Sequence, residues 1–103
     1  MSELVFSNDE QQHRYEARRD GALAAFAEYN LLADNIIMFT HTEVQPAFEG
    51  QGVGSALARH VLDAARSAGQ QVIPVCQFIA GYIRKHPDYV PLVREDVRRA
   101  FKI

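Results

Sequence analysis

A glycine-rich turn between a strand-like segment and a helix-like segment is the feature that most constrains the fold. Residues 36–44 (IIMFTHTEV) are rich in β-branched and aromatic residues, which predicts a strand, and Pro46 ends it. Glycines follow at positions 50, 52 and 54, and apolar residues then recur at helical spacing as far as Gly69. Residues 71–76 (QVIPVC) predict another strand. Because a helix carries the chain from one strand to the other, we expect these two strands to be parallel.

The segments on either side complete the predicted fold. Residues 13–18 (HRYEAR) predict a strand, and Asp20-Gly21 is a strong hairpin signal. Residues 22–32 (ALAAFAEYNLL) are ambiguous: their alanines favour a helix, whereas their place between two turns favours a strand, which we choose. Residues 78–85 and the C-terminal segment predict short helices. We therefore expect one α/β (α+β) domain of 103 residues, whose mixed sheet is an antiparallel meander followed by helix, strand and helix.

Composition argues against several classes of protein. The net charge of −2 and the lack of a basic stripe argue against a nucleic-acid-binding protein. The single cysteine, Cys76, cannot form an internal disulfide, and the four histidines lack metal-ligand spacing, so no metal is expected. No apolar run is long enough to span a bilayer, and the acidic, polar N-terminus does not resemble a signal peptide. These features predict a cytoplasmic protein that does not bind membranes.

The glycine-rich turn has the properties of a phosphate-binding loop. Glycines at alternate positions let backbone amides approach a ligand closely. The first turn of the following helix leaves N–H groups without partners and carries partial positive charge, which suits a phosphate or pyrophosphate.

Two common phosphate loops do not fit. A Walker loop needs lysine after its second conserved glycine, and here Gly54 is followed by Ser55-Ala56. A dinucleotide-binding fingerprint needs G-x-G-x-x-G spacing, which positions 50, 52 and 54 do not give. A glycine-rich turn that binds nothing stays open at this level of reasoning.

The residues around the glycines resemble the acetyl-CoA signature of the GNAT acetyltransferase superfamily. The family motif Arg/Gln-x-x-Gly-x-Gly/Ala maps onto residues 49–54 (EGQGVG), with Glu49 in place of Arg or Gln. The resemblance implies that the CoA pyrophosphate is held by the backbone amides of Gln51, Gly52, Val53, Gly54 and Ser55. It also implies that the backbone of residues 41–44, with Thr42 and Val44, pairs with the pantetheine arm. Because a carboxylate would repel the pyrophosphate, we expect Glu49 to point to solvent.

The likeness extends over residues 12–91, which resemble the short YjdJ-type N-acetyltransferase domains. The shared motifs are Asp-Gly, His-Thr-Glu-Val, Gly-Gln-Gly, Pro-x-Cys-x-Phe, Tyr-Ile and His-Pro-Asp-Tyr, and all occur here in that order. The chain is too short for the additional helices and strands with which larger members build their acceptor site.

Four side chains are candidates for the chemistry of acetyl transfer. His41 and Glu43 would share one face of the strand over residues 36–44, where either could act as general base or both could form an ordinary hydrogen-bonded pair. Cys76 would lie near the acetyl group, as a nucleophile or as a small buried side chain. Tyr82 matches the tyrosine that protonates the departing thiolate in the superfamily, and could instead be packing.

The sequence therefore favours an N-acetyltransferase that uses acetyl-CoA and an unidentified amine acceptor. The alternative is a non-catalytic module that binds or senses acyl-CoA. A third reading, a small structural domain without a ligand, requires the glycine pattern to be accidental. The sequence does not assign an oligomeric state.

Overall fold

The computed structural model describes residues 3–103 and contains a five-stranded mixed sheet, with the helices in the C-terminal half of the chain. The strands are β1 (Val5–Asp9), β2 (Arg14–Arg19), β3 (Ala22–Leu32), β4 (Ile36–Val44) and β5 (Gln71–Pro74). The α-helices are α1 (Val53–Ser67), α2 (Gln77–Lys85) and α3 (Glu95–Arg98). Three 3₁₀ segments, Pro46–Phe48, Pro87–Leu92 and Arg99–Phe101, complete the chain.

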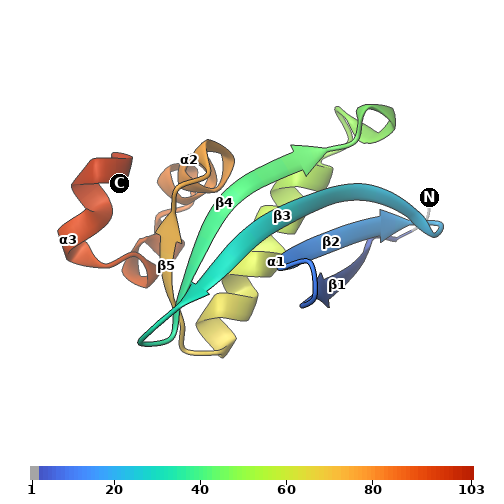
Figure 1. The fold of residues 1–103 in the computed structure, drawn as a ribbon. Coiled ribbons are helices and arrows are strands. Elements are labelled where there is room, and N and C mark those ends of the chain that lie inside the picture. The colour runs from blue at the N-terminus through green and yellow to red at the C-terminus, as the bar shows by residue number, and fades with distance from the viewer. Residues whose placement is uncertain (1–2) are drawn as a thin grey trace.

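The order of strands in the sheet follows the order in the chain. Strands β1 to β4 pair antiparallel, and β5 joins β4 in parallel after the crossover through α1. Helix α1 packs on one face of the sheet, and α2 and α3 lie beside the β5 edge (Figure 1). This arrangement confirms the predicted α/β class and the order meander, helix, strand, helix.

The segment over residues 22–32 is the strand β3, so its position between turns outweighs the helix propensity of alanine. Asp20 and Gly21 both have left-handed backbone, with φ of 52° and 80°, as a two-residue hairpin turn requires. Ala25 and Ala27 are 0 % exposed and belong to the same core as the buried face of α1. Small side chains at these positions let the helix approach the sheet closely, which explains why alanines occur in a strand.

Strand β1 is the element that the sequence analysis missed. It pairs with β2 from Val5↔Arg18 to Asp9↔Arg14 and forms an edge of the sheet. Most of its residues are polar, but the Phe6 side chain points towards α1. The Phe6 ring stacks on His60 of α1 at a centroid distance of 4.4 Å. An edge strand with so few apolar residues gives only a weak alternating pattern.

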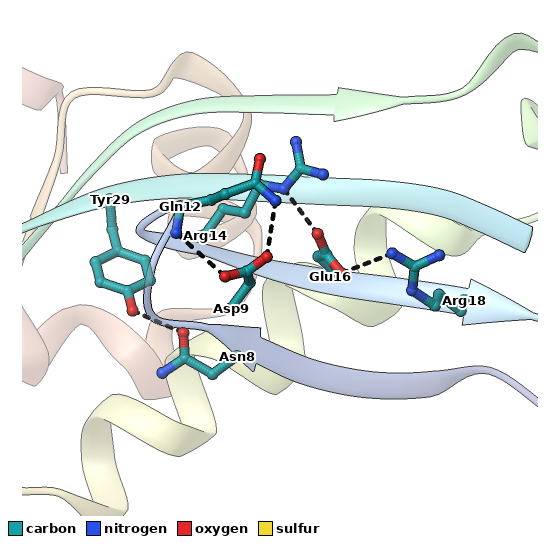
Figure 2. Close-up of polar contacts among 7 residues, drawn as sticks. All are labelled: Asn8, Asp9, Gln12, Arg14, Glu16, Arg18 and Tyr29. Carbon is teal, nitrogen blue, oxygen red and sulfur yellow. Dashed lines mark hydrogen bonds and ion pairs between the residues drawn. The ribbon is translucent and has the colours of Figure 1, made fainter. Parts of the chain in front are cut away.

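A buried carboxylate with two arginines organises the face of β2 that lies opposite α1 (Figure 2). Glu16 is 5 % exposed and accepts hydrogen bonds from Arg14 at 2.8 Å and from Arg18 at 2.9 Å. Burial raises the pKa of Glu16, but the hydrogen bonds and charges of the two arginines outweigh it and hold the pKa below its ordinary value. Nearby, the Tyr29 hydroxyl donates to Asn8 at 2.6 Å, which ties β3 to β1.

Candidate functional site

The pairing between β4 and β5 stops halfway along β4. Its register runs from Ile36↔Gln71 to Phe39↔Pro74, and the predicted strand over residues 71–76 therefore ends two residues early. Proline ends the strand because it has no N–H for the ladder. The Cys76 amide donates to the Phe39 carbonyl at 2.9 Å, and α2 begins at the next residue. Cys76 thus lies at the start of a helix beside β4, not in a strand.

A bulge in β4 lies at the point where the two strands part. The β3–β4 register passes from Tyr29↔Phe39 to Glu28↔His41, so Thr40 is the extra residue. A bulge bends its strand and increases the local twist. Residues 41–44 therefore stay paired with β3 but extend beyond the last β4–β5 pair. Along these residues, the edge of β4 on the side of α2 has no pairing with β5.

The glycine-rich loop has a backbone that side chains other than glycine rarely adopt. Gly50 and Gly52 have φ of 78° and 76°, in the left-handed region. A Cβ added to either would meet no atom within 4 Å, so both positions face open space. The first helical bond of α1 runs from the Ala56 amide to the Gly52 carbonyl at 3.1 Å. The amides of residues 53–55 therefore precede the helical ladder and are available to a ligand.

Gly54 has a different role from the other two glycines. It is buried in the first turn of α1, and an added Cβ would lie 2.7 Å from Cζ of Phe78 and 3.2 Å from Cγ2 of Val44. Its lack of a side chain lets the helix start close to β4 and lets the Phe78 ring lie against it. This glycine serves packing, whereas Gly50 and Gly52 serve backbone conformation.

Two adjoining hollows extend from this loop to α2. One, of about 230 Å³, is lined by Val44, the loop and Ser55, and the other, of about 240 Å³, by Ser55, Tyr82 and Lys85. Both include Phe78, which is 42 % exposed and stands between them. The sequence predicts Phe78 as a core aromatic residue, because no basic residues interleave with the aromatic residues, and this prediction is wrong. Its exposed ring at this place is a feature of the site that depends on the fold.

Two of the predicted site residues meet at the inner wall of this region. The Cys76 thiol donates to Oγ1 of Thr42 at 3.2 Å, and Cys76 is 7 % exposed. Val44 follows on the same side of β4, where it contacts the start of α1 as described above. The structure thus gathers Thr42, Val44, the loop and Cys76 around the end of the β4–β5 pair.

His41 and Glu43 share the other face of β4, as the strand period predicts. Their closest atoms, His41 Nε2 and Glu43 Oε1, are 3.8 Å apart, and the side chains are 55 % and 54 % exposed. The His41 ring lies 6.1 Å from that of Phe26 on β3. The two candidate bases therefore face away from Thr42, while the Cys76 thiol lies on the Thr42 side.

Tyr82 lies on α2 with its ring half-buried. It stacks on His86 at a centroid distance of 4.0 Å and lies 5.9 Å from the ring of Tyr89. Nδ1 of His86 lies 2.9 Å from the Tyr82 carbonyl, which closes the helix end. Tyr82 also lines the second hollow, so it belongs to both the packing and the site.

The loop carries one charged group of its own, Glu49, which is exposed and also lines the first hollow. A second charge reaches the loop from β2. Nη1 of Arg19 donates to Oε1 of Gln51 at 2.6 Å, across 32 positions of sequence. Sequence reasoning missed this contact because no local pattern connects the end of β2 with the loop.

Comparisons with known proteins agree with this geometry. The profile of the family described as GCN5-related N-acetyl-transferase matches residues 14–92. The chain belongs to this family. The match spans the sheet from β2 onward, α1 and α2, and so includes the bulged strand, the glycine-rich loop and Cys76. It confirms the resemblance to the GNAT superfamily.

Two relatives support the assignment. The chain is similar to Protein NATD1 of Mus musculus, with 27 % identity over 81 residues that cover 78 % of this chain and 74 % of the mouse protein. Its structure is similar to the solution structure of a GCN5-like candidate N-acetyltransferase from Staphylococcus aureus, with a TM-score of 0.69, 25 % identity and 91 % of each chain covered. Family membership supports acyl transfer in general, and the acceptor is not defined by it.

Two features are absent from residues 3–103. Within this range no helix has the length and apolar character needed to cross a membrane. No group of three or more His, Cys, Asp or Glu side chains in the same range is arranged to hold a metal ion.

Proposed function

We propose that the chain binds acetyl-CoA at the glycine-rich loop and transfers the acetyl group to an amine. The observation that carries the proposal is the left-handed backbone at Gly50 and Gly52 directly before α1, next to the unpaired end of β4. The site fits a pyrophosphate, because an added Cβ at either glycine would project into open space and the amides of residues 53–55 precede the helical ladder.

The β4 edge would hold the pantetheine arm. Residues 41–44 extend past the last β4–β5 pair. Their backbone N–H and C=O groups on this edge can therefore hydrogen-bond to an extended ligand, as they would to a neighbouring strand. Val44 and Thr42 then line the arm from the loop towards Cys76. This path places the thioester near the Cys76–Thr42 contact, at the point where β4 and β5 part.

In the proposed reaction, the nitrogen lone pair of the amine attacks the thioester carbonyl. The new C–N bond forms as the C–S bond breaks, and the thiol of CoA leaves with a proton. Glu43 or His41 takes the proton that the amine loses, and the Tyr82 hydroxyl supplies the proton that the thiolate gains. The thioester would lie in the gap where β4 and β5 part, so an amine that enters the gap from the exposed face of β4 passes His41 and Glu43.

A covalent route through Cys76 is the competing mechanism. In it, the Cys76 sulfur attacks the thioester carbonyl, the C–S bond to CoA breaks, and CoA leaves as its thiol with the proton that Cys76 loses. The amine then attacks the acetyl-cysteine, which forms the amide and returns the Cys76 thiol. The buried thiol donates to Thr42, and the candidate bases lie on the other face of the strand. This placement favours direct attack by the amine, with Cys76 as part of the wall.

One observation favours the alternative of a non-catalytic acyl-CoA-binding module: both candidate bases are more than half exposed, at 55 % and 54 %. Turnover distinguishes the two functions. The protein is incubated with acetyl-CoA and a panel of primary amines, and the release of free thiol is followed. Mass spectrometry of the protein then reports any retained CoA. Amine-dependent thiol release supports the transferase. Retained CoA without release across the panel supports the binding module, and neither retention nor release contradicts both.

A further inference from the structure

The charge balance at the glycine-rich loop does not suit a pyrophosphate if only the loop is considered. The first hollow is lined by Glu49 as its one charged residue, where the family has Arg or Gln. No lysine or arginine occurs between residues 20 and 58 of the sequence. A pyrophosphate carries two negative charges, so a loop with a carboxylate alone would repel it.

A guanidinium from another part of the fold offsets this deficit. Arg19 is the last residue of β2, next to the Asp20–Gly21 turn. Its Nη1 donates to Oε1 of Gln51 at 2.6 Å, and Nε2 of Gln51 lies 3.4 Å from the Ala47 carbonyl. The side-chain amide of Gln51 thus has a partner at each end. Because Gln51 lies in the loop directly before α1, this contact keeps the positive charge of Arg19 beside the loop.

We propose that Arg19 is a CoA-binding residue that supplies, from the β2–β3 hairpin, the positive charge for the pyrophosphate. This inference rests on the proposed function. Arg19 acts in two ways: it attracts the phosphates through its charge, and it holds Gln51 and the loop in place through its hydrogen bond. A guanidinium suits both tasks, because it is always charged and its N–H groups hydrogen-bond to amide and phosphate oxygens.

The test is the dissociation constant of CoA, measured by calorimetry at about 0.05 M and about 0.5 M salt. The variants are Arg19→Gln, Arg19→Lys, Glu49→Gln and a control, Arg59→Gln. Arg59 lies on α1 with a 72 % exposed side chain and an ion pair of 3.8 Å to Asp63, so its loss changes net charge equally without touching the loop. Circular dichroism and thermal unfolding establish that each variant is folded.

We expect Arg19→Gln to weaken CoA binding at least fivefold at low salt and much less at high salt, because salt screens exposed charges. Arg19→Lys should retain most of the affinity, Glu49→Gln should tighten binding at low salt, and Arg59→Gln should match the wild type. If Arg19→Gln does not fold, an Arg19→Lys protein that loses most of its affinity overturns the inference, and Glu49→Gln tests the charge argument.

Several results would overturn the inference while leaving the proposed function intact. These are wild-type affinity in folded Arg19→Gln, a loss that is the same at both salt concentrations, an equal loss in Arg59→Gln, or an Arg19→Lys protein as weak as Arg19→Gln. An unchanged Glu49→Gln affinity would also contradict the charge argument. Failure of the wild-type protein to bind CoA at all would instead overturn the proposed function, and the inference with it.

Discussion

Replacing Gly52 by aspartate and by asparagine separates the charge of the loop from its shape. Both side chains have nearly the same size, and both tolerate left-handed backbone better than other residues with a Cβ. At φ of 76° the two variants share whatever backbone strain remains, and a Cβ at this position meets no protein atom within 4 Å. The difference between them therefore reports the negative charge alone.

The size of that difference follows from Coulomb's law. An aspartate at about 5 Å from one phosphate charge in a water-like dielectric is repelled by about 0.8 kcal/mol. The two charges of a pyrophosphate give about 1.7 kcal/mol, which corresponds to roughly fifteenfold in affinity. Exclusion of water by the ligand lowers the local dielectric, so this value is a lower bound.

The assay is calorimetric titration of both folded variants with CoA at low salt. Gly52→Asp should bind at least tenfold more weakly than Gly52→Asn, and added salt should narrow the gap. Equal affinities, with both proteins folded, would refute the placement of the pyrophosphate at the Gly52 end of α1. A Gly52→Asn protein that loses all binding would show that side-chain volume, not charge, decides access to the loop.

Further predictions concern Cys76, the helix α1 and the segment after α2. Cys76→Ala should keep most of the turnover, and wild-type protein incubated with acetyl-CoA alone should carry no acetyl group. Loss of turnover in Cys76→Ala, together with an acetyl group on the wild-type protein, would establish the covalent route. Burial lowers the pKa of His60 below 6.5, against a smaller opposing effect of Asp63. The unfolded chain therefore binds more protons than the folded chain below about pH 6.5, so the free energy of unfolding should fall as pH drops from 7 to 5. In chemical denaturation, His60→Phe should show a weaker dependence of the unfolding free energy on pH. The same pH dependence in both proteins would contradict this. The Tyr89 hydroxyl donates to Asp63 at 2.7 Å, so Tyr89→Phe should cost about 1 kcal/mol of unfolding free energy, and no change would show that water replaces the bond.

Segments bounded by turn signals were predictable from the sequence, even where their own composition was ambiguous. The strand over residues 36–44 and the strand over residues 22–32 have the predicted bounds, because turn residues mark both ends of each. The stop of α1 at Gly69 follows from its left-handed φ of 69°. Alternation within β4 also gave the correct shared face for His41 and Glu43.

Features that depend on contacts distant in sequence were not predictable. The bulge at Thr40 depends on the pairing of two strands, and the sequence of β4 alone does not mark it. The shorter β5 places Cys76 before a helix, because its amide bonds to Phe39 of a neighbouring strand. The Arg19–Gln51 contact joins two turns that lie next to each other only once the meander and α1 have packed. The roles of the catalytic candidates stay predictions.

The most direct test of CoA binding at the glycine-rich loop is an amide NMR titration of the 103-residue protein with CoA. We predict that the largest shift changes occur at the amides of residues 51–55 and 41–44, with smaller changes at Phe78 and Tyr82. Amides of β1, at the far edge of the sheet, should serve as the unperturbed reference. Saturable changes confined to other elements, or no change at millimolar CoA, would contradict this prediction.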